Sequence, residues 1–131
     1  MVTSKEKPKE VVRPYDLEER LEEYGEKIID LAKKVPRNTI TIPIISQLVR
    51  SGTSIGANYM EANGASSKKD FKNKIYICKK ETNETKHWLR MLSRSYDKVQ
   101  DECRELWQEG HEYARIFSKI LKTLKNSKKE V

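Results

Sequence analysis

Apolar residues recur along this chain in alternating steps of three and four positions. Steps of that size place side chains on one face of an α-helix, which completes a turn about every 3.6 residues. Four such stripes follow one another, and together they predict an all-α protein. Their members are Leu17, Leu21, Tyr24, Ile28, Leu31 and Val35; then Ile45, Leu48, Gly52, Ile55, Tyr59 and Ala62; then Phe71, Ile75, Cys78, Thr82, Thr85, Leu89 and Leu92; and finally Val99, Cys103, Leu106, Gly110, Tyr113, Phe117, Ile120 and Leu124.

Helix-ending and helix-starting residues separate the stripes. Pro36 follows the first stripe and Gly64 the second, while Ser67 and Asp70 have the spacing of a capping box that opens the third. The connections are therefore short. Helices whose apolar residues alternate in threes and fours pack at about +20°. We expect an antiparallel up-down four-helix bundle.

The length of 131 residues fits one domain, which we expect over residues 15–125. A flexible N-terminal tail (residues 1–14) and a basic C-terminal tail (residues 126–131) would flank it. Two cysteines are too few for a disulfide framework, and no apolar run has the length of a signal peptide or a membrane span. These features favour a cytoplasmic protein that does not associate with a membrane.

Charge is distributed unevenly over the four helices. The chain has 27 Lys and Arg residues against 20 Asp and Glu, a net charge of +7. The third helix carries most of this excess, with nine cations and three acids over residues 68–96, whereas the first helix is acidic. Projected at about 100° per residue, all its cations except Lys74 fall within an arc of about 120° that contains none of the acids. These eight residues, the basic strip, are Lys68, Lys69, Lys72, Lys79, Lys80, Lys86, Arg90 and Arg94.

The basic strip is our candidate site for nucleic acid. It extends over about 40 Å, and an unmixed row of cations suits the phosphates of RNA or DNA. Two alternatives stay open at this point. The strip could be an ordinary solubilising surface, or it could dock an acidic partner such as the first helix of a neighbouring subunit, a contact that can close into a ring.

A second group of polar residues lies away from the strip. Arg50, Ser54, Asn58 and Glu61 share one line on the second helix, roughly opposite its apolar stripe, while Glu81 and Glu84 lie among apolar residues on the third. Carboxylates in such surroundings need a donor, and Arg50 is suited to a bidentate pair. We expect all six residues to form a structural polar network or an interface.

Catalysis and metal binding are disfavoured. Glu81 and Glu84 are one turn apart, but no nucleophile or glycine-rich phosphate loop accompanies them. The sequence has a single Glu-x-x-His of the di-iron type, and His111 has no second ligand at metal spacing. Trp88 and Trp107 lie on or beside apolar stripes, so we expect them to pack rather than bind bases. We predict no catalytic residues, no metal and no cofactor.

The run from Gln47 to Ala62, the segment Ser67 to Phe71, and then Glu81, Glu84, Thr85, Trp88 and Leu89 resemble a known family. It is that of the bacterial four-helix bundle proteins encoded in intervening sequences of large-subunit ribosomal RNA genes, which are related to the accessory variability proteins of diversity-generating retroelements. The resemblance implies a homopentameric barrel with a basic surface. It also implies nucleic-acid binding and association with a reverse transcriptase for the retroelement relatives, and it brings no catalytic residues.

The sequence therefore leads to a non-enzymatic, oligomeric protein that binds RNA or DNA with little sequence specificity. Ribosomal RNA or a reverse transcriptase are the partners that the resemblance suggests. The alternative is a protein interaction scaffold whose basic face docks an acidic partner or a neighbouring subunit.

Overall fold

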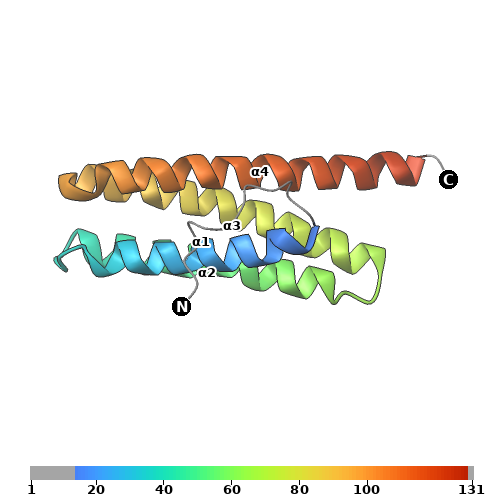
Figure 1. Cartoon of the computed structure of the whole chain (residues 1–131), viewed down its shortest axis with the longest axis horizontal. Coiled ribbons are helices and arrows are strands. Elements are labelled where there is room, and N and C mark those ends of the chain that lie inside the picture. Colours follow the sequence, from blue (N-terminus) through green and yellow to red (C-terminus); the bar gives the residue numbers. More distant parts are fainter. Residues whose placement is uncertain (1–13, 130–131) are drawn as a thin grey trace, which may run out of the picture.

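The computed structural model describes residues 14–129, which form four α-helices and no strands. They are α1 (Pro14–Lys33), α2 (Thr41–Asn63), α3 (Lys68–Ser95) and α4 (Gln100–Lys129), and a short 3-10 turn, η2 (Asp97–Val99), connects the last two. The prediction of an all-helical protein with four helices is confirmed. Figure 1 shows the helices extended along the longest axis of the molecule.

The first and last helices extend slightly beyond the residues 15–125 expected for the bundle. Helix α1 begins at Pro14, and the rest of the N-terminal tail predicted over residues 1–14 lies outside the described residues. Helix α4 continues to Lys129, so most of the segment predicted as a basic tail over residues 126–131 is helical. The segment contains no Gly or Pro that would break a helix, so the last stripe could not mark the true end.

Local hydrogen bonds fix where two of the helices begin. The side chain of Ser67 accepts a hydrogen bond of 3.1 Å from the backbone N–H of Asp70 and caps α3, as predicted. Before α2, the side chain of Asn38 accepts from the backbone N–H groups of Ile40 and Thr41, both at 2.9 Å. These bonds satisfy backbone donors that the first turn of a helix leaves free.

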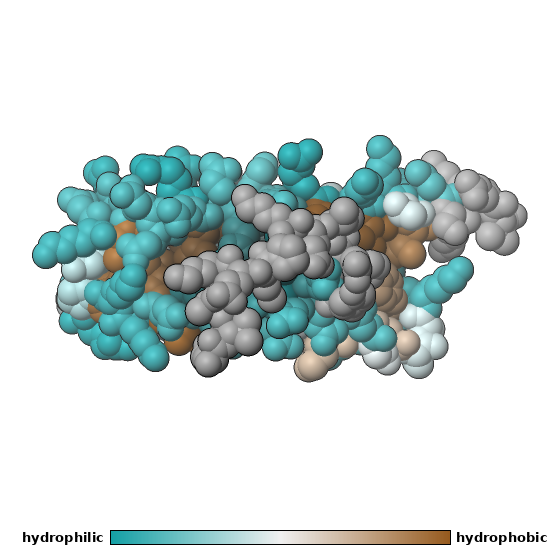
Figure 2. Space-filling view, viewed as in Figure 1, coloured by the Kyte–Doolittle hydropathy of each residue, from teal (hydrophilic) through white to brown (hydrophobic). Residues whose placement is uncertain are grey.

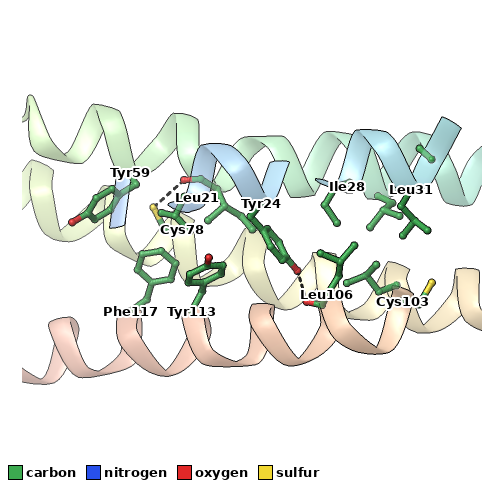
Figure 3. Packing of buried hydrophobic residues seen from close by; sticks show 14 of the residues in the cluster. Leu21, Tyr24, Ile28, Leu31, Tyr59, Cys78, Cys103, Leu106, Tyr113 and Phe117 are labelled. Atoms are coloured by element: carbon green, nitrogen blue, oxygen red, sulfur yellow. Dashed lines mark hydrogen bonds between the residues drawn. The ribbon is translucent and has the colours of Figure 1, made fainter. Parts of the chain in front are cut away.

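The predicted stripes turn inward and meet in one core. Helix α1 packs on α2, α2 on α3 and α3 on α4, whereas α1 and α4 approach each other more sparsely. Figure 3 shows Tyr24 of α1 reaching across that last seam to the backbone of α4, where its hydroxyl donates to the carbonyl oxygen of Leu106 at 2.7 Å. The ring of Tyr24 also meets Tyr113 edge-on, with centroids 5.3 Å apart.

One stripe departs from its prediction at the end. Leu121 is buried near the C-terminal end of α4, whereas Ile120 and Leu124, the predicted members, are only partly buried. A strict three-four alternation drifts by about 20° per seven residues on a straight helix. Over the length of α4 this drift moves the buried position to a neighbouring residue.

The surface of the protein is mainly polar. Figure 2 shows that hydrophilic residues cover most of the described surface on one face, with hydrophobic residues visible in the furrows between them. No helix within residues 14–129 is both long enough and apolar enough to cross a membrane.

Candidate nucleic-acid interface

The exposed side of α3 is defined by the same periodicity as its buried side. Because Ile75, Cys78, Thr82, Thr85, Leu89 and Leu92 face the core, a line of exposed residues runs along the opposite face. That line is Lys69, Asn73, Tyr76, Lys80, Asn83, His87, Arg90 and Arg94. The centre of the basic strip is therefore open to solvent along the whole helix.

The eight residues of the basic strip divide into two groups. Lys68, Lys69, Lys80, Arg90 and Arg94 are exposed, whereas Lys72, Lys79 and Lys86 are partly buried. Within the described part of the chain, none of the eight forms an ion pair. Lys74, the one cation of α3 that the helical projection leaves outside the strip, is paired with Glu61. The charge of the strip is thus not neutralised by its own helix or its neighbours.

Helix α1 uses its cations differently. Arg20 and Lys27 contact Glu112 and Glu109 of α4 at 2.9 and 3.3 Å, and Lys34, one residue beyond the end of α1, pairs with Glu102. These pairs cross the sparse seam between the two helices. The acids of α1 that remain exposed to solvent are Glu19, Glu22, Glu23, Glu26 and Asp30. The outer face of α1 is consequently more acidic than the sum of its charges indicates.

The predicted polar network is divided into separate parts. Arg50 reaches α3, where one guanidinium nitrogen lies 3.1 and 3.4 Å from the two carboxylate oxygens of Glu81 and the other binds Glu84. Glu81 is only 7% exposed, so Arg50 supplies the donor that this buried carboxylate needs. Desolvation alone would lower the pKa of Arg50, but attraction to the two carboxylates outweighs it and raises that pKa.

The side chains of the other three residues of that group have partners other than Glu81 and Glu84. Ser54 donates to the backbone carbonyl of Arg50 at 2.6 Å, and Asn58 donates to that of Ser54 at 2.9 Å, so both side chains bind their own helix. Glu61 pairs with Lys74 instead. Polar side chains often find such local backbone partners in helices. The four residues lie on one line of α2, but their side chains do not form one hydrogen-bonded network.

No arrangement for metal chemistry appears in residues 14–129, where no three His, Cys, Asp or Glu side chains are grouped for a metal ion. The two cysteines are free and buried. Burial raises the pKa of Cys78 to about 12 and that of Cys103 to about 11, so both thiols stay protonated and unreactive at neutral pH.

Sequence reasoning missed one cluster beside the strip. The rings of Trp107 and His111 stack with centroids 5.2 Å apart and planes 9° from parallel. Lys86 lies over the same indole at 4.5 Å from its centroid, and its ammonium nitrogen is 2.9 Å from Nδ1 of His111. The spacing of Trp107 and His111, one turn apart on α4, was the available signal. These three residues form the Trp107 cluster.

Together, the fold and this surface define a small helical protein whose described residues present an unpaired basic strip. The family model of the 23S rRNA-intervening sequence proteins matches residues 16–119, and the chain belongs to this family. The family resemblance inferred from the sequence is confirmed, while its extension to the retroelement proteins stays a prediction.

Solved structures include a similar protein. A crystallised protein of unknown function from the S23 ribosomal protein family of Bacteroides thetaiotaomicron is 33% identical to this chain, with a TM-score of 0.74. The similarity covers 81% of this chain and 98% of that one. No curated protein matches the chain.

Proposed function

We propose that this protein binds RNA or DNA through the basic strip, without enzymatic activity and with little sequence specificity. The observation that carries the proposal is the absence of ion pairs at all eight cations within the described residues, on a helix whose ninth cation is paired. A solvated helix surface usually mixes the two signs of charge through neighbouring pairs. A long row of unpaired cations instead favours a polyanion whose condensed counterions are released on binding.

The wider assembly belongs to the same proposal. The ion pairs of Arg20, Lys27 and Lys34 join ascending positions along α1 and its end to descending positions on α4, which supports an antiparallel up-down bundle. We further propose a ring-shaped homo-oligomer, a pentamer by family resemblance, in the cytoplasm. Ribosomal RNA or a reverse transcriptase are the partners that the family suggests.

The test is a salt titration of binding with a matched pair of variants. The strip variant carries Lys69→Glu, Lys80→Glu and Arg94→Glu, all at exposed positions. The control carries Lys33→Glu, Lys98→Glu and Lys122→Glu, which are exposed cations outside α3. Both variants change the net charge by the same amount. Only the location of the change therefore differs between them.

The wild type should bind a 30-nucleotide RNA or DNA with an affinity that falls steeply as salt rises. The strip variant should lose most binding and reduce the slope of log K against log salt by about 2–3, because each neutralised phosphate contributes about 0.7–0.9. The control should keep the wild-type slope. Equal losses in the two variants, or no binding by the wild type at low salt, would refute the proposal.

A second candidate function is an interaction scaffold, and the exposed acids of α1 favour it. In this second function, the basic strip binds the acidic outer face of α1 from a neighbouring subunit, or it binds an acidic partner protein. The variant Glu22→Lys, Glu26→Lys and Asp30→Lys should then dissociate the oligomer, as measured by light scattering during size-exclusion chromatography. An unchanged mass would exclude docking between subunits through α1.

A further inference from the structure

A groove lies between the C-terminal half of α3 and the N-terminal half of α4, beside the basic strip. Its volume is about 270 Å³, and its lining includes Leu89, Arg90, Gln100, Cys103, Arg104 and Trp107. Leu89 and Cys103 are buried core residues and give the groove an apolar floor. The remaining four residues supply two guanidinium groups, an amide and an indole. The groove thus combines an apolar surface with positive charge.

Trp107 is held in place by the cluster described above. His111 stacks parallel to its ring, and the ammonium group of Lys86 lies over the same ring system at 4.5 Å. The bond between Lys86 and Nδ1 of His111 ties these two side chains to each other. An aromatic wall fixed in this way loses little freedom when a second planar group stacks on it. The indole of Trp107 is also close to cations. This arrangement suits a ligand that joins a planar ring to a negatively charged group.

The two arginines are available to such a ligand. Arg90 is exposed and has no ion pair within the described residues. Arg104 contacts Asp101 of its own helix at 3.1 Å, but the two side chains are 69% and 90% exposed, and exposed pairs of this kind are weak. A phosphate can therefore compete for the guanidinium of Arg104. Because Arg90 also belongs to the basic strip, the groove continues the surface that we propose for the phosphate backbone.

The volume of the groove limits the size of its ligand. It is below the range of about 300–1,000 Å³ that is usual for sites of drug-sized molecules. A single nucleobase fits this limit better than a dinucleotide. Bases within a duplex have both faces covered by their neighbours, so only an unpaired base can stack on a protein side chain.

We propose that this groove takes one unpaired base of single-stranded nucleic acid, stacked on Trp107, with the adjoining phosphate bound by Arg90 and Arg104. The inference rests on the proposed function and makes it specific: the strip holds the phosphates of a strand, and the groove distinguishes single strands from duplexes. Stacking on an aromatic side chain tolerates any base, so the site adds strand preference without sequence preference.

The experiment uses Trp88→Phe as the parent protein, which leaves Trp107 as its single tryptophan. Three probes of equal length are titrated at fixed salt: oligo(dT), an abasic deoxyribose phosphate strand, and a DNA duplex. Oligo(dT) should quench the fluorescence of Trp107, and the abasic strand should bind without quenching. Adding Trp107→Leu should weaken oligo(dT) binding by roughly 5- to 100-fold and leave abasic binding unchanged. Trp107→Phe, which keeps a ring, should recover part of the loss.

The outcomes separate this inference from the proposed function. If oligo(dT) and the abasic strand bind equally and neither quenches Trp107, the groove does not hold a base, although the strip still binds the backbone. If no probe binds, and an RNA strand of the same length does not bind either, both the proposed function and the groove site are wrong. Quenching by the duplex as strong as that by oligo(dT) would also refute an unpaired base. The fluorescence measurement decides the matter even if Trp107→Leu fails to fold.

Discussion

Gly52 of α2 lies against the side chain of Ile28 of α1, and it provides a sharp test of the packing. A β-carbon at this position would lie 2.9 and 3.0 Å from the two γ-carbons of Ile28 and 3.2 Å from its β-carbon. Ile28 is fully buried and β-branched, so its χ1 is restricted. Rotation cannot move its β-carbon, which is fixed to the backbone. The Gly52→Ala protein must therefore shift α1 away from α2.

The expected cost follows from two opposing effects. Overpacking a core typically costs about 1–3 kcal/mol. Alanine in a helix interior recovers about 1 kcal/mol relative to glycine. We expect Gly52→Ala to be destabilised by about 1 kcal/mol, with an upper limit of about 2 kcal/mol.

Gly25 of α1 offers a matched control across the same interface. A β-carbon there would have its nearest neighbours at 3.5 Å, an ordinary contact distance, and they belong to Gly52 and Thr53. Gly25→Ala should therefore keep the gain in helix propensity and be more stable than the wild type by about 0.5–1 kcal/mol.

Chemical denaturation followed by circular dichroism at 222 nm, at one protein concentration, measures both variants. The free energies of unfolding should move in opposite directions. A Gly52→Ala protein more stable than the wild type, or equal changes in stability for both substitutions, would refute the reasoning from contact distances.

Three further predictions concern buried polar groups. Arg50→Met should destabilise the fold by about 1–3 kcal/mol, because it leaves a buried carboxylate without its donor, and adding Glu81→Gln should restore part of that loss in a denaturation cycle. Because burial raises the pKa values of Cys78 and Cys103, their thiols ionise at lower pH in the unfolded chain than in the folded protein. Their contribution to stability is therefore fully present below about pH 8.5, the usual thiol pKa, and is lost as the pH rises toward 11 to 12. Denaturation curves at pH 8, 9 and 10 test this, and replacing both cysteines by alanine should flatten the fall. Tyr24→Phe removes a hydrogen bond of 2.7 Å to a buried carbonyl of α4 and should cost about 1 kcal/mol by the same measurement, whereas no loss would show that the hydroxyl is dispensable.

The sequence predicted the helices well because their signals are local. The stripes depend only on the turn of the α-helix, and the cap at Ser67 depends on residues three positions apart. The error at Leu121 arose because a fixed three-four alternation was extended over the whole of α4, where the true period is slightly longer. Register over a long helix is set by tertiary packing, which the pattern alone does not contain.

The candidate sites were harder to predict because they join different helices. The apolar surroundings of Glu81 and Glu84 predicted a donor such as Arg50, but the pattern gave no reason for Ser54 to bind its own backbone instead. Trp107 packs against the core, as its place beside an apolar stripe predicted. Its association with Lys86 depends on how α3 and α4 are aligned, and the sequence does not specify that alignment.

The two candidate functions make opposite demands on the same cations. If the acidic face of α1 from a neighbouring subunit covered the basic strip, nucleic acid would have to displace it, and binding would dissociate the assembly. If the oligomer forms elsewhere, binding leaves its mass unchanged. Arg20 and Lys27 of α1, and Lys34 just beyond its end, are paired with acids of α4, whereas the outer acids of α1 stay exposed and would repel phosphates. The exposed acids of α1 would thus repel a nucleic-acid strand that follows the basic strip. In the scaffold function, the same acids would bind the basic strip of a neighbouring subunit.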